Sequence, residues 1–128
     1  MKEETQKLLH KAERAVGASE CLLARGDTDF AVARSYYVML YAADALLCEK
    51  GLSFFDHAGS HAAFEEHFVR CGLIDPKYHR WLVESLEIRI TADYSAEADF
   101  TVDETRHMIE RAREFLTAAR RHLEHAAA

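Results

Sequence analysis

The feature that most constrains the fold is residues 34–47, RSYYVMLYAADALL. Large residues recur in it at the spacing of one helix face, namely Tyr37, Leu40, Tyr41 and Leu47. Polar groups stand beside them, namely Ser35, Tyr36 and Asp44. A surface helix does not need so many aromatic residues, and tyrosine hydroxyls that enter a bundle usually find partners there. We therefore expect this helix at the centre of the structure and as one wall of any site.

Composition favours helices over strands throughout the chain. The 128 residues include one proline and five glycines, 49% are apolar, and Ala and Leu far outnumber Val and Ile. This length suits a single domain over residues 1–128. The formal net charge of −6 makes the whole chain a poor non-specific binder of nucleic acid, so no DNA partner is expected. A local basic surface remains compatible with that charge.

The cysteines and the hydropathy pattern bear on location. Cys21, Cys48 and Cys71 lie far apart, are odd in number and have no CxxC spacing, so we expect neither disulfides nor structural zinc. The first residues are charged and amphipathic, unlike a signal peptide, and no stretch reaches membrane-spanning length. These features predict a soluble protein of the cytoplasm.

Start and stop signals predict about five helices. Glycines end the first three, at Gly26, Gly51 and Gly72. The later helices have start signals: Asp27, Ser60, Asp75-Pro76 and the pair Thr101 and Glu104. The predicted helices span about 3–25, 27–49, 60–72, 76–92 and 101 to near the C-terminus. Short connections between them predict an all-α, antiparallel up-and-down bundle.

The segment EIRITADYS, residues 87–95, holds the first candidate site. Arg89 lies one helical turn before Asp93, and Tyr94 follows. One interpretation is an ordinary ion pair at i, i+4, which contributes only a few tenths of a kcal/mol. The other is a guanidinium aimed at a phosphate and oriented by polar partners. Arg89 falls at the edge of the buried face, where its charge needs a partner, and Asp93 is the nearest candidate.

Other chemistry finds little support. His57 and His61 are four residues apart, but Gly59 and Ser60 between them are expected to break the helix, and Glu104-x-x-His107 has no second copy. No glycine-rich phosphate loop and no nucleophile elbow occur. The C-terminal arginines alternate with glutamates and are expected on a solvated face. We expect no metal and no cofactor. Apolar excess marks Phe54 and Phe55 as candidates for covering the open end of the core or meeting another subunit, and Tyr36 as a further candidate for the subunit contact.

Taken together, these segments resemble the HEPN domain, and in particular its small single-domain prokaryotic branch. The resemblance rests on RSYYVMLYAADALL, then EKGL, then GSHAAFEEHFVRCGLIDPKYHRWL, then the segment from Arg89 to Tyr94, in the family's order. It implies a helical bundle that forms homodimers. Many members are metal-independent ribonucleases, and small ones are often the toxin of a pair whose antitoxin is a minimal nucleotidyltransferase. RNA or a nucleotide would then be the ligand.

The resemblance also implies roles for residues. Arg89 matches an arginine thought to hold phosphate, but the histidine that follows it in active members is absent. Tyr94, Ser95 and Ala96 stand where it would be. Asp93 or His61 would then handle protons, and Tyr94 would position them or be adenylylated by the nucleotidyltransferase. The alternative is a non-catalytic domain that binds a nucleotide or the nucleotidyltransferase.

Overall fold

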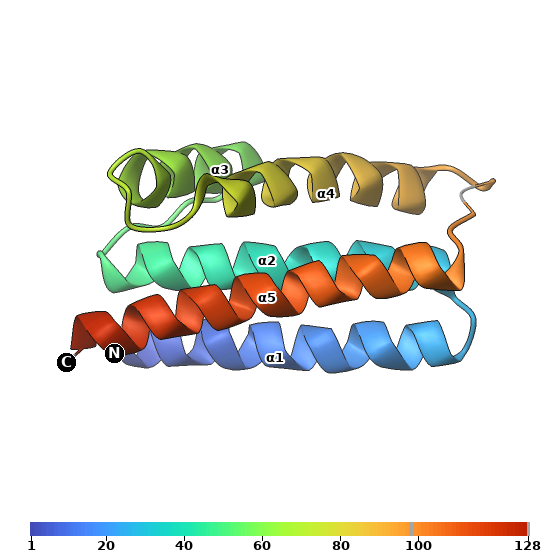
Figure 1. Ribbon diagram of the computed structural model, residues 1–128, viewed down its shortest axis with the longest axis horizontal. Helices are drawn as coiled ribbons and strands as arrows, with labels where there is room; N and C mark the ends of the chain where they lie inside the picture. Colours follow the sequence, from blue (N-terminus) through green and yellow to red (C-terminus); the bar gives the residue numbers. More distant parts are fainter. Residues whose placement is uncertain (98, 128) are drawn as a thin grey trace.

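A computed structural model of the protein describes residues 1–97 and 99–127. Its helices are α1 (Glu3–Ala24), α2 (Thr28–Glu49), α3 (His57–Phe64), the π-helical turn η1 (Glu65–Val69), α4 (Pro76–Tyr94) and α5 (Val102–Ala127). The long helices α1, α2, α4 and α5 run alternately up and down, so α1 begins and α5 ends at the same end of the bundle (Figure 1). The predicted all-α antiparallel bundle is confirmed.

Most of the predicted helix boundaries hold. The three glycines have positive φ, of 85° at Gly26, 81° at Gly51 and 76° at Gly72. Asp75 caps α4 by accepting from the Lys77 amide at 2.9 Å, and Pro76 occupies the first turn. Thr101 and Glu104 form the predicted capping box, in which each side chain accepts from the other's backbone amide. Helix α4 continues two residues further than predicted, to Tyr94.

The start of α3 was predicted wrongly. The helix begins at His57 instead of Ser60, because Asp56 caps it by accepting from the Gly59 amide at 2.5 Å. Gly59 and Ser60 therefore lie inside the first turns and do not break the helix. The Ser60 hydroxyl donates to Asp44 Oδ1 at 2.8 Å, so it ties α3 to α2. As a result, His57 and His61 lie one turn apart on one helix.

Helix α2 is the centre of the bundle, as its aromatic face predicted. It packs against α1, α3, α4 and α5, and it is buried on most of its surface. Its core neighbours include the rings of Phe64, Phe68 and Phe115, which contact one another across α3, η1 and α5. This dense packing holds α2 rigidly, so that side chains at its edge have fixed positions.

Two expectations about the apolar excess are wrong. Tyr36 is fully buried and cannot reach a subunit contact from its place in this fold. Phe55 is fully exposed and Phe54 is 40% exposed, so this pair does not close the end of the core. Their exposure leaves a subunit contact at Phe54 and Phe55 as a prediction. In the described residues, no helix combines the length and the apolar character that crossing a membrane requires.

Candidate functional site

Arg89 lies half-buried between α4 and α2, as its register predicted. Its Nη2 donates to the Tyr37 hydroxyl at 2.7 Å. Its Nε lies 2.9 Å from Asp93 Oδ2, so the predicted i, i+4 ion pair forms. The Nε–H bond does not point toward this oxygen as a hydrogen bond requires, so the contact is an ion pair without a hydrogen bond. Asp93 and Tyr37 thus hold the guanidinium from two sides and fix its direction.

Tyr36, the neighbour of Tyr37 on α2, joins two histidines of α3. Its hydroxyl lies 2.6 Å from His57 Nδ1 and 2.8 Å from His61 Nε2. The Tyr36 and His57 rings stack with centroids 5.5 Å apart and planes 13° from parallel. The helical spacing of His57 and His61 is what allows both rings to reach one hydroxyl.

The arginine and histidine halves form one site. The Tyr36 and Tyr37 rings are in edge contact, and the His57 ring lies 6.0 Å from the Tyr37 ring. Burial lowers the pKa of His57, and the nearby charge of Arg89 lowers it further by a smaller amount. We refer to these five residues as the tyrosine–histidine site: Tyr36, Tyr37, His57, His61 and Arg89.

The environment fixes where the protons lie in this site. Burial, helped by His57 and His79, lowers the pKa of His61 to about 4, so His61 is neutral near pH 7. Burial raises the pKa of Tyr36 above its ordinary value, so the phenol keeps its proton. That single proton serves one histidine only, and the hydroxyl oxygen must accept an N–H from the other. The two histidines are therefore coupled through Tyr36.

The structure also positions the remaining sequence-predicted residues. Tyr94 ends α4 and is 78% exposed, with no hydrogen-bond partner in the described part of the chain. His61 belongs to the site, and its hydrogen bond there is to the Tyr36 hydroxyl. His57 was assessed only as a metal ligand, because Gly59 and Ser60 were expected to break its helix. The signal that could have found it is Asp56, a cap residue directly before it.

Metal ligands do not gather around the histidines. Within residues 1–97 and 99–127, no three His, Cys, Asp or Glu side chains come together as ligands for one ion. His57 and His61 direct one nitrogen each to the Tyr36 hydroxyl instead. The two histidines and the guanidinium of the site can supply acid–base and phosphate-binding chemistry.

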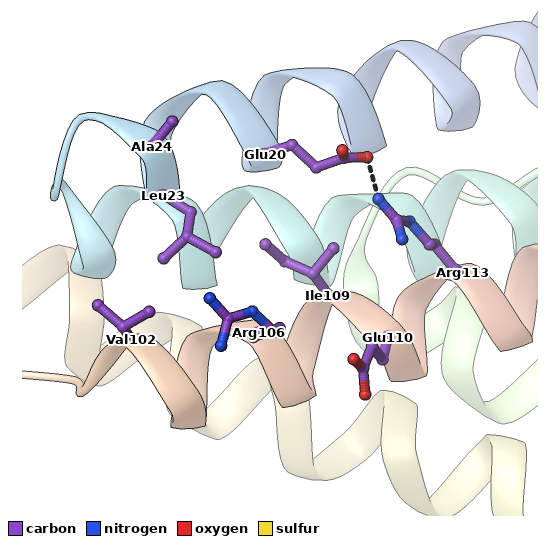
Figure 2. A pocket seen from close by; sticks show the side chains of 8 residues that line it. All are labelled: Glu20, Leu23, Ala24, Val102, Arg106, Ile109, Glu110 and Arg113. Atoms are coloured by element: carbon purple, nitrogen blue, oxygen red, sulfur yellow. Dashed lines mark ion pairs between the residues drawn. The ribbon is translucent and has the colours of Figure 1, made fainter.

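A hollow between α1 and α5, which Figure 2 shows from close by, shares no lining residue with this site. It holds about 410 Å³ and is lined by apolar side chains such as Leu23 and Ile109 between charged ones. Arg113 of α5 pairs with Glu20 of α1 across it, as the dashed line in Figure 2 marks. Arg120 and Glu13 form a second ion pair between the same two helices. Both arginines therefore pair with carboxylates of α1, whereas the sequence predicted a solvated face in which the glutamates of α5 itself alternate with them.

Comparisons with known proteins agree with the fold. A family described as HEPN domain matches residues 5–122. A protein of Methanocaldococcus jannaschii whose name marks it as a candidate toxin, MJ0142, is 33% identical over 122 residues, which cover 95% of this chain and 83% of the relative. A second candidate toxin of that organism, MJ0605, is 36% identical over 97 residues, 76% of this chain and 72% of the relative. The UPF0332 protein of Thermotoga maritima is 32% identical over 114 residues, 89% of this chain and 86% of the relative.

Proposed function

The chain belongs to the HEPN domain family, and from this membership we propose that it is the toxin of a toxin–antitoxin-like pair. It acts as a homodimer that cleaves RNA at the tyrosine–histidine site without a metal ion. Two relatives whose names mark them as candidate toxins support the first part. The observation that supports RNA cleavage at this site is the chain of contacts from Arg89 through Tyr37 and Tyr36 to His57.

Arg89 is the phosphate-binding group of the proposal. Tyr37 and Asp93 occupy Nη2 and Nε, and Nη1 has no partner in the described residues. A guanidinium held in one direction binds a phosphate oxygen at a lower entropic cost than a free side chain. Asp93 acts here as a positioning residue and not as the proton acceptor that the sequence suggested, because its carboxylate faces the guanidinium.

His57 supplies the base that is missing after Arg89. Its Nδ1 contacts Tyr36, and its Nε2 has no hydrogen-bond partner in the described residues. If Nδ1–H donates to the Tyr36 oxygen and the Tyr36 proton goes to His61, then Nε2 carries a free lone pair. His57 can gain a proton there without any rearrangement, because neutral His61 still accepts from Tyr36. His61 and Tyr36 are then positioning residues.

The reaction that follows from this arrangement is a transesterification. The Nε2 atom of His57 takes the proton of a ribose 2′-hydroxyl, and the 2′-oxygen attacks the phosphorus held by Arg89. The bond from phosphorus to the 5′-oxygen breaks, and the leaving oxygen takes a proton from water on the opposite side. The products carry a 2′,3′-cyclic phosphate and a 5′-hydroxyl, and His57 returns its proton to solvent.

A minimal nucleotidyltransferase is the proposed partner, and Tyr94 is its proposed target. The Tyr94 ring is 78% exposed at the end of the helix that carries Arg89. Adenylylation would add a bulky anion five residues from that arginine and compete with RNA for it. Transfer of labelled AMP to the protein but not to Tyr94→Phe would support this control, and equal labelling of both would contradict it.

The test of activity is cleavage of RNA in EDTA, with product ends analysed. We expect His57→Gln to lower the rate by about 10²–10⁴-fold, the contribution typical of a positioned acid–base group. Arg89→Ala removes the phosphate-binding charge and should lower the rate by about 10²–10³-fold. His107→Gln and Arg80→Ala, two exposed residues outside the site, are the matched controls and should keep the rate. Arg89→Ala should also relieve growth inhibition in cells.

The absence of a histidine after Arg89 favours a second function, a non-catalytic domain that binds a nucleotide or the nucleotidyltransferase. Intact RNA in the presence of folded wild-type protein, together with tight binding of ATP or the partner, would establish that alternative and refute cleavage. Cleavage that survives His57→Gln would keep the ribonuclease but remove His57 from it.

A further inference from the structure

A small basic groove lies between α1 and α2. It holds about 180 Å³, and three cations line it around the ring of Tyr41, namely Lys11, Arg14 and Arg34. Lys11 and Arg14 come from α1, and Arg34 comes from α2 one turn before Tyr37. We refer to these four residues as the basic groove.

The cations of the basic groove lack acidic neighbours, although the chain carries a net charge of −6. No Asp or Glu stands three or four residues before or after Lys11, Arg14 or Arg34. Among the described residues, none of these three side chains takes part in an ion pair, so none of them has a carboxylate oxygen within 4 Å. The arginines that face α1 from α5 differ, because Arg113 and Arg120 both pair with glutamates. Like charges that gather without counter-charges attract an anion.

Aromatic rings connect the basic groove with the tyrosine–histidine site. The Arg34 guanidinium lies 4.5 Å from the centre of the Tyr37 ring, whose hydroxyl accepts from Arg89. The Tyr37 and Tyr41 rings lie 5.8 Å apart, and Lys11 Nζ lies 4.7 Å from the Tyr41 ring. Cations and half-buried rings thus alternate across α2, which packs against α1 and α4 (Figure 1).

We propose that the basic groove binds a phosphate of the RNA strand, next along the strand from the phosphate at Arg89. This inference rests on the proposed function and extends it from one phosphate to a defined path. Cationic grooves interleaved with aromatic rings are the form in which proteins hold single strands. The guanidinium carbons of Arg34 and Arg89 are both close to one ring, at 4.5 and 5.3 Å from its centre. One strand can therefore contact both.

The acidic residue that follows Tyr41 on α2 is engaged with α3. Asp44 lies three residues after Tyr41, but its Oδ1 accepts from Ser60 on α3. Burial raises the pKa of Asp44 above its ordinary value, against a smaller lowering by the hydrogen bond from Ser60. The basic groove keeps an excess of positive charge with Asp44 included.

The experiment measures binding of a short fluorescent oligouridylate whose 2′-hydroxyls are methylated, so that no cleavage occurs. Affinity is followed by anisotropy over a series of KCl concentrations. For each phosphate that a variant no longer binds, the slope of log K against log salt should fall in magnitude by about 0.7. We expect that fall for Arg14→Gln/Arg34→Gln, and for Lys11→Gln a weaker affinity. The control Arg80→Gln/Arg121→Gln removes the same charge from exposed positions, and neither arginine has an ion pair among the described residues, so it should retain the wild-type slope.

The outcomes separate the two proposals. If Arg89→Gln weakens binding and the groove variant has the slope of its control, the basic groove is refuted and the site at Arg89 stands. If wild-type protein does not bind the oligonucleotide at all, RNA recognition fails and the basic groove fails with it. A groove variant that keeps the slope but dissociates the dimer in sedimentation would assign these cations to an interface between copies instead.

Discussion

The pKa of His61 predicts how the stability of this protein depends on pH. His61 is 7% exposed, and its pKa falls from 6.5 to about 4 on folding, mainly because burial disfavours its charge. At pH values between these two, His61 therefore binds a proton in the unfolded chain but not in the folded protein. Stability contributed by neutral His61 is complete above the unfolded pKa and is lost as the pH falls toward the folded one.

The magnitude follows from the two pKa values. From 6.5 and about 4, proton linkage gives a loss of about 2 kcal/mol in the free energy of unfolding between pH 7.5 and pH 5. His57 and His122 also have lowered pKa values and add to the loss, whereas Asp44, whose pKa is raised, opposes it weakly at the acid end. Only a comparison with a variant isolates the part due to His61.

Urea unfolding at both pH values provides that comparison. His61→Gln does not titrate in this range and can still accept a hydrogen bond from Tyr36, so its stability should fall by about 2 kcal/mol less than that of the wild type. The exposed residue His107→Gln is the control and should follow the wild type. Equal losses in wild type and His61→Gln would refute a neutral, buried His61 and with it the proton arrangement proposed for His57.

Three further predictions concern stability near pH 7. Tyr36→Phe should lower the free energy of unfolding by about 1–3 kcal/mol, because buried His61 loses its hydrogen-bond partner. In a double-mutant cycle, His61→Leu should recover part of this loss, and strictly additive losses would contradict the hydrogen bond. Phe115→Ala should lower the free energy of unfolding, measured by chemical denaturation, by about 3–5 kcal/mol, since the ring is 1% exposed and the core cannot close around the cavity. A loss below about 1 kcal/mol would mean that α5 packs differently. Gly17→Ala should stabilise by about 0.5–1 kcal/mol, because Gly17 is inside α1 with open space around it. Its control, Gly26→Ala, should destabilise, because Gly26 has a φ of 85°; the opposite signs can be read from the two melting curves.

The sequence alone determined the class of the fold and the position of its central helix. The spacing of Tyr37, Leu40, Tyr41 and Leu47 is a local property of one helix, and so are the glycine stops and the capping box at Thr101. Such features depend on neighbours in the chain, so they can be recognised without a tertiary structure. The ion pair of Arg89 with Asp93 was predictable for the same reason.

The tertiary structure alone decided which side chains share the site. His57 was missed because a glycine and a serine suggested a break, whereas the Asp56 cap begins the helix earlier and holds its first turn. The contacts of Tyr36 with His57 and His61 join residues 21 and 25 positions apart, and Arg89 reaches Tyr37 over 52. No periodicity encodes such contacts, because they depend on how α2, α3 and α4 pack together. The same packing decided that Tyr36 is buried, and it brought Lys11 and Arg14 of α1 beside Arg34 of α2.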